Sequence, residues 1–160
     1  MSITSLQAGK IICEMSGWET SSLRLQKLLY VAHLFYVGRN EGKPLIKEDF
    51  EAWRYGPVEP NLYRYCRGFG ADYIKNIFPL ESGVPSESGE YKMLKETVED
   101  TIGIEGRNRI TESALIGFTH WKEGAWYNAY HNKKRGFFTS PIIPLDAIKK
   151  EYVDRGLNKE

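Results

Sequence analysis

A predicted helix that is apolar on almost every side constrains the fold of this chain more than any other feature. It begins after Ser21 or Ser22 and ends at Gly38. One stripe at helical spacing consists of Leu25, Leu28, Leu29, Ala32 and Tyr36, and the opposite side carries Tyr30, Val31 and Leu34. Such a helix either lies at the centre of a small domain or is covered by a partner. In a chain of 160 residues we expect the first arrangement: a mainly α fold, with one compact multi-helix domain over residues 1–160 around a central buried helix.

Local signals predict the remaining elements. Helices are predicted from Thr4 to Gly17, from Pro60 to Gly68, from Glu90 to Ile102, from Thr111 to His120 and from Leu145 to Arg155. Side chains alternate from Glu51 to Val58, which indicates a short strand or hairpin element that the turn signal Gly56–Pro57 would end. We also expect a short element from Ala125 to Tyr130 and an extended segment over 137–143.

The charge balance and the cysteines limit the possible environments of the protein. The 22 basic and 21 acidic residues give a net charge of +1, which provides no long-range field for direct binding of nucleic acid. We find no signal peptide and no apolar run of about 20 residues, the length that spans a bilayer. Cys13 and Cys66 occupy apolar helical positions, which is typical of free thiols in a reducing compartment. We therefore expect a cytoplasmic protein without membrane contact, and the sequence leaves the oligomeric state open.

The sequence offers few candidates for catalysis or metal binding. His33, His120 and His131 are its three histidines, and none has a second ligand at metal-binding spacing. No glycine-rich segment has the spacing of a phosphate-binding loop. We therefore expect no metal, no cofactor and no catalytic residue. A small hydrolase that uses a histidine such as His120 is a weaker alternative.

Two groups of aromatic residues could form contact surfaces. The first group consists of Lys27, Trp53, Arg54, Tyr55 and Tyr63, next to the turn signal at Gly56 and Pro57, and the second consists of Trp126 and Tyr127. Tryptophan and tyrosine bury large areas with few rotatable bonds, and arginine adds a fork of hydrogen-bond donors. The residue pattern allows two interpretations: these side chains pack in the core, or they meet a protein partner.

Four motifs together are similar to a known family. They are Leu25-Gln-Lys-Leu-Leu-Tyr30, Gly42-Lys-Pro-Leu45, Phe50-Glu-Ala-Trp-Arg-Tyr-Gly-Pro-Val58, and Thr119-His-Trp followed by Ala125-Trp126. In this combination the chain resembles the Panacea antitoxin domain family, formerly a domain of unknown function, which includes SocA-like and phage-associated GepA-like proteins. The resemblance extends from about Leu6 to Tyr152, and the first and third motifs in combination make it specific.

The resemblance implies a mainly helical antitoxin, not an enzyme, that neutralises a co-encoded protein toxin by direct binding. The partner-binding residues that we expect are Lys27, Trp53, Arg54, Tyr55, Tyr63, Trp126 and Tyr127, and the structural motif consists of Leu25, Leu28, Leu29, Tyr30, Gly56 and Pro57. The resemblance also implies an alternative, in which the protein is a proteolytic adaptor that delivers the toxin to a ClpXP-type protease. Neither the toxin nor the stoichiometry of the complex follows from the sequence.

Overall fold

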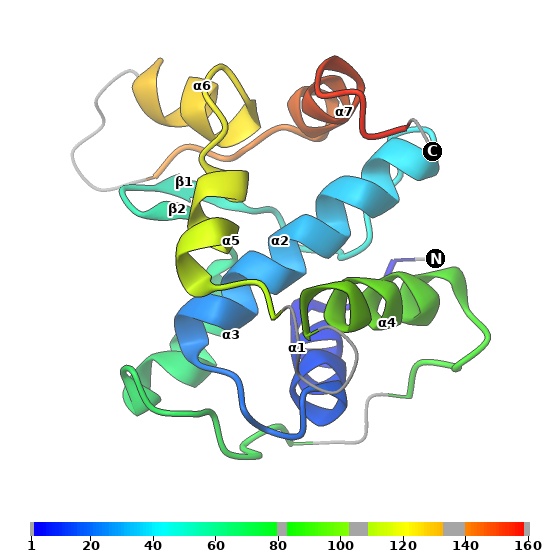
Figure 1. The fold of residues 1–160 in the computed structure, drawn as a ribbon, viewed down its shortest axis with the longest axis vertical. Coiled ribbons are helices and arrows are strands. Elements are labelled where there is room, and N and C mark those ends of the chain that lie inside the picture. Colours follow the sequence, from blue (N-terminus) through cyan, green and yellow to red (C-terminus); the bar gives the residue numbers. More distant parts are fainter. Residues whose placement is uncertain (1, 80–82, 103–108, 133–139, 159–160) are drawn as a thin grey trace.

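The computed structural model describes residues 2–79, 83–102, 109–132 and 140–158, and these ranges form a mainly helical fold (Figure 1). In chain order the elements are α1 (Ser5–Met15), α2 (Ser22–Arg39), β1 (Glu51–Trp53), β2 (Gly56–Val58), α3 (Pro60–Cys66), the 3-10 helix η1 (Arg67–Phe69), α4 (Gly89–Ile102), α5 (Glu112–Thr119), α6 (Ala125–His131) and α7 (Leu145–Asp154). The predicted fold class, mainly α with a short hairpin, is therefore confirmed.

Helix α2 is the central element. It crosses the middle of the molecule, with α1 and α4 on one side and the β1–β2 hairpin, α6 and α7 on the other (Figure 1). It contacts α1, α3, α4, α5, α7 and β2. Of its 18 residues, 14 are buried, including Leu25, Leu28, Leu29 and Tyr30. A helix covered on all sides needs apolar residues on all sides, so the predicted central position of this helix is confirmed.

Side-chain caps fix the starts of three helices where the sequence predicts them. At α1 the Thr4 hydroxyl accepts a hydrogen bond from the backbone N–H of Gln7 (3.1 Å), and the Gln7 side chain accepts one from the Thr4 N–H (2.8 Å). The hydroxyls of Ser21 at α2 and Thr111 at α5 each accept a hydrogen bond from the backbone N–H three residues later. These hydroxyls satisfy N–H groups that have no partner within the helix.

The predicted end of α2 at Gly38 is wrong by one residue, because Gly38 lies inside the helix. A methyl group at Gly38 would overlap the ring of Tyr152 on α7. The glycine is therefore needed for close approach of α7 and not as a helix stop. The helix ends at Arg39, where Asn40 caps it.

The strand predicted from Glu51 to Val58 is a two-stranded antiparallel hairpin. Its register pairs Glu51 with Val58 and Trp53 with Gly56, so Arg54 and Tyr55 form the turn. The expectation that Gly56–Pro57 would end the strand is wrong, because both residues belong to β2. Proline is tolerated there because, among the described residues, β2 pairs with β1 alone and is therefore an edge strand that needs no donor at Pro57.

The segment before α7 runs beside the other edge of β1. The N–H of Ala52 donates to the carbonyl of Pro141, and the N–H of Ile143 donates to the carbonyl of Phe50, both at 2.8 Å. The extended segment predicted over 137–143 is thus found from residue 140 onward, and its first residues lie outside the described ranges. These bonds connect the hairpin to the C-terminal part of the fold.

Two further features bear on the environment of the protein. Cys13 and Cys66 are both buried and free, and burial raises the pKa of the Cys13 thiol to about 12 and that of the Cys66 thiol to about 11. Among the described helices, none is both long enough and apolar enough to span a bilayer.

Candidate functional site

The tip of the hairpin is an exposed aromatic and basic surface. Tyr55 is 72% exposed, which is unusual for a large aromatic side chain. The neighbouring Arg54 is also exposed, and its guanidinium lies over the Tyr55 ring at 5.4 Å from the centroid. Both side chains of the turn therefore point away from the core and are available to a partner.

Lys27 supports the turn from below. Its side chain comes from α2, is only 1% exposed, and donates a hydrogen bond from Nζ to the carbonyl of Tyr55 (2.8 Å). Burial lowers the pKa of Lys27 to about 8. Gly56 has a φ of 119°, and a side chain there would overlap the Lys27 ammonium. The absence of a side chain at Gly56 leaves room for the Lys27 ammonium. This contact is a structural reason for a glycine at position 56 beside a lysine at position 27.

Trp53 and Tyr63 form the side wall of the same surface. Their rings meet edge to face, with centroids 4.9 Å apart and planes at 69°. The indole N–H of Trp53 donates to the carboxylate of Glu51 (2.9 Å), and both aromatic side chains are half-buried. The structure therefore brings together Lys27, Trp53, Arg54, Tyr55 and Tyr63, as the sequence predicts, and we call this group the hairpin cluster.

The second predicted group joins the first through Trp126. The indole N–H of Trp126 donates to the carbonyl of Trp53 (2.8 Å), so α6 is bonded to β1. Trp126 is only 6% exposed, and its ring stacks on Tyr130 with centroids 5.3 Å apart. Tyr127 is half-buried beside it. Trp126 therefore supports the hairpin from within, and Tyr127 offers the more accessible surface of the two.

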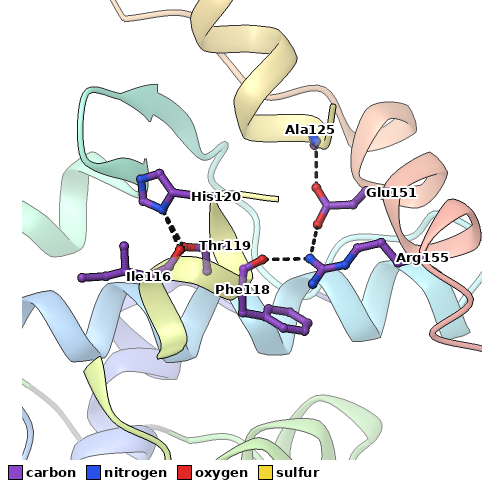
Figure 2. Close-up of polar contacts among 7 residues, drawn as sticks. All are labelled: Ile116, Phe118, Thr119, His120, Ala125, Glu151 and Arg155. Atoms are coloured by element: carbon purple, nitrogen blue, oxygen red, sulfur yellow. Dashed lines mark hydrogen bonds and ion pairs between the residues drawn. The ribbon is translucent and has the colours of Figure 1, made fainter. Parts of the chain in front are cut away.

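A buried carboxylate fixes α6 against α7 (Figure 2). Glu151 is 3% exposed and accepts a hydrogen bond from the N–H of Ala125 (2.7 Å) and another from Arg155 (3.0 Å). Arg155 also donates to the carbonyl of Phe118 at the end of α5 (2.8 Å). Burial raises the pKa of Glu151, although both hydrogen bonds favour its ionised form. A side chain at Gly124 would overlap this carboxylate, so a glycine is required before α6.

His120 lies between the two groups. Its Nδ1 is 2.6 Å from the carbonyl of Ile116, so this nitrogen carries the proton and donates (Figure 2). Its Nε2 and the Lys27 ammonium both lie next to Gly56. Burial and the charge of Lys27 lower the pKa of His120, which favours the neutral ring. Among the described residues, no three His, Cys, Asp or Glu side chains come close enough together to hold a metal ion.

A pocket of about 300 Å³ opens beside the hairpin cluster. Lys27, Trp53 and Tyr63 line it, together with Leu23 and Arg67, which the sequence interpretation missed. Leu23 precedes Lys27 by four residues and Arg67 follows Tyr63 by four, so each lies one helical turn from a predicted residue. That spacing could have identified both. Leu23 is 41% exposed, which is high for a leucine in the central helix.

Comparison with known proteins identifies the family of this chain. A family model described as "Antitoxin SocA-like, Panacea domain" matches residues 25–127, which is more than half of the chain. The chain therefore belongs to the SocA-like Panacea domain family. The match begins in α2 and ends in α6, so it includes the hairpin cluster and Trp126.

One curated relative is the protein named Antitoxin SocA of Caulobacter vibrioides (strain NA1000 / CB15N). It is 35% identical to this chain over 114 residues, which cover 66% of this chain and 57% of the relative. The chain thus spans somewhat more than half the length of that protein. No solved structure matches the chain.

Proposed function

We propose that this chain is the antitoxin of a toxin–antitoxin system and that it neutralises a co-encoded protein toxin by direct binding. Its membership of the SocA-like Panacea family and its 35% identity to a protein named Antitoxin SocA support the class. The resemblance of its motifs to that family supports a protein toxin as the partner.

The hairpin cluster is the surface that we assign to toxin binding. The observation that carries this assignment is the 72% exposure of Tyr55 at a turn that two buried side chains hold in place. Lys27 bonds the carbonyl of Tyr55, and Trp126 bonds the carbonyl of Trp53. A turn fixed in this way loses little conformational entropy when it binds. The exposed Arg54 and Tyr55 are also the residue types that carry most of the energy in protein interfaces.

The mechanism that fits this surface is occlusion of the toxin. A standard protein interface buries about 1,600 Å² in total, and a few Trp, Tyr or Arg side chains dominate its energy. The hairpin turn would insert into the toxin and cover its active site, with Tyr63 and Tyr127 at the edges of the contact. No bond is made or broken by the antitoxin in this mechanism.

Growth rescue tests the proposal. The product of the neighbouring gene is expressed in cells together with this protein or with the variants Arg54→Ala, Tyr55→Ala and Tyr63→Ala. Each is expected to weaken toxin binding by about 10-fold or more, because truncating an interface anchor costs about 2 kcal/mol. The thermal midpoint should stay nearly unchanged for Arg54→Ala and Tyr55→Ala, because both side chains are exposed.

Tyr73→Ala is the matched control, because Tyr73 is 53% exposed and lies outside the hairpin cluster. Full rescue by all three hairpin variants would disprove the assignment of this surface. The half-life of the toxin in the same cells separates occlusion from delivery to a ClpXP-type protease: occlusion leaves the half-life unchanged, whereas an adaptor shortens it.

A further inference from the structure

The pocket beside the hairpin cluster is positively charged. Of the described side chains that line it, Lys27 and Arg67 are cationic, and none is an aspartate or a glutamate. Lys27 contributes from α2, and Arg67 comes from η1, directly after α3. The remaining walls are mostly apolar and include Leu23, Trp53 and Tyr63. The pocket thus combines a buried ammonium, a second cation nearer the solvent and apolar sides.

The Lys27 ammonium has unused hydrogen-bonding capacity. An ammonium carries three N–H donors, and among the described residues only the carbonyl of Tyr55 accepts from it. Two other polar groups in the pocket wall are engaged elsewhere: both ends of the Gln26 amide bond the backbone of Glu59, and the Trp53 indole bonds Glu51. A buried cation without a counter-charge is unfavourable, so an anion that enters the pocket would gain a strong, charge-assisted contact.

We propose that this pocket receives the carboxylate of a glutamate side chain from the toxin, an inference that rests on the proposed function. Lys27 is 1% exposed, so a carboxylate that contacts its ammonium has to extend inward from the surface of the partner, as the side chain of a glutamate does. The two methylenes of a glutamate would lie between Leu23 and the aromatic wall. A C-terminal carboxylate stands directly on the main chain and lacks these two methylenes, so we expect it to reach the Lys27 ammonium less well.

Small probes test the inference without the toxin. The probes are N-acetyl-glutamate amide, its neutral isostere N-acetyl-glutamine amide, and N-acetyl-alanine, which presents a terminal carboxylate. The readout is the ¹H–¹⁵N signal of the Trp53 indole, assigned with Trp53→Phe. We expect a saturable shift with the glutamate probe, with a dissociation constant on the order of 1–10 mM for a ligand of this size. The other two probes should bind at least about 10-fold more weakly.

Two arginine variants give a matched comparison. Arg67 lines the pocket, whereas Arg64, an exposed arginine on the preceding turn, does not. Arg67→Gln should weaken the glutamate probe about 3-fold or more, as expected when one partner of a charge contact is lost, and Arg64→Gln should leave it unchanged. Lys27→Met should abolish binding. Lys27→Met also removes the hydrogen bond to the Tyr55 carbonyl and could disturb the hairpin turn. The comparison of Arg67→Gln with Arg64→Gln does not depend on that bond.

Three results would overturn the inference: equal binding of the glutamate and glutamine probes, equal effects of Arg67→Gln and Arg64→Gln, or no saturable shift up to about 100 mM probe. If N-acetyl-alanine bound more tightly than the glutamate probe, the pocket would take a C-terminal carboxylate and not a glutamate side chain. Growth rescue by the wild type together with a failed probe titration would leave the antitoxin function intact and remove only this pocket. A positive titration without growth rescue would support the anion pocket and count against the antitoxin function.

Discussion

Three polar side chains on consecutive turns of α2 are fully or almost fully buried: Lys27, Tyr30 and His33. Lys27 has the Tyr55 carbonyl as its partner, whereas the Tyr30 hydroxyl and His33 Nδ1 have no hydrogen-bond partner within the described part of the chain. Burial raises the pKa of Tyr30 and lowers that of His33 to about 3. At the scale of single residues, burial in the central helix therefore keeps Tyr30 and His33 in their neutral forms.

The burial of His33 predicts a loss of stability in acid. The unfolded chain binds a proton on this imidazole near its ordinary pKa of 6.5, whereas the folded protein does not until about pH 3. Between these values the unfolded state binds more protons, so stability falls as the pH falls. From pH 7 to pH 5 the loss from His33 is about 2 kcal/mol. Urea unfolding at both pH values measures it.

The variant His33→Leu isolates this contribution. It should lose about 2 kcal/mol less than the wild type over the same pH change, while other titrating groups affect both proteins equally. An identical acid loss in the two proteins would show that His33 is not held neutral in the fold.

At the scale of elements, the sequence predicts those features that depend on residues close together in the chain. The start of α1 at Thr4, the start of α3 at Pro60 and the all-round burial of α2 follow from nearby residues, and all are observed. The role of Gly38 could not be predicted, because it depends on Tyr152, which is more than a hundred residues away. Contacts at such separation leave no periodic signal in the sequence.

In the candidate site, too, some features could be predicted from the sequence and others could not. The hairpin cluster could be recognised because its aromatic residues stand together near Gly56 and Pro57. The burial of Trp126 could not, because its hydrogen bond to Trp53 joins α6 to β1 across 73 positions. The position of the turn was also missed, since Gly and Pro usually mark turns but here occupy a strand edge.

Two glycines in helices predict opposite responses to alanine. Gly38→Ala should destabilise the protein by about 1–3 kcal/mol, because the new methyl group overlaps Tyr152 and forces α7 away from α2. Gly117→Ala on α5 should stabilise it by about 0.5–1 kcal/mol, because, beyond its chain neighbours and the helix backbone, no described atom comes within 4 Å of the new methyl group and alanine favours the helix. Chemical denaturation measures both, and a stabilising Gly38→Ala would refute the close contact of these helices.

The packing of α6 depends on Glu151. Glu151→Ala leaves the Ala125 N–H without its acceptor and the Arg155 guanidinium without its counter-charge, with only the Phe118 carbonyl still accepting from Arg155, so we expect a loss of about 3–5 kcal/mol. Asp154→Ala on the same helix is the control: its ion pair with Lys150 is exposed and should contribute less than about 1 kcal/mol. Thermal unfolding compares the two. Similar small losses would show that Glu151 does not hold α6 in place.

At the scale of the whole molecule, α2 links the core to the hairpin. The same helix packs against α1 and α4 and supplies Lys27 beneath the turn, so the exposed surface is part of the folded unit (Figure 1). The family match over residues 25–127 covers this helix, the hairpin and α6 together. The hairpin turn is thus fixed to the helical core, and we propose that the antitoxin covers its toxin with this surface.

Hydrogen–deuterium exchange with and without the product of the neighbouring gene tests the central claim most directly. If this protein works by covering that product with its hairpin cluster, backbone amides from Glu51 to Arg67 should gain the strongest protection in the complex. They should gain none when Arg54 and Tyr55 are both changed to alanine. A toxin that is neutralised while these amides exchange as in the free protein would contradict the account.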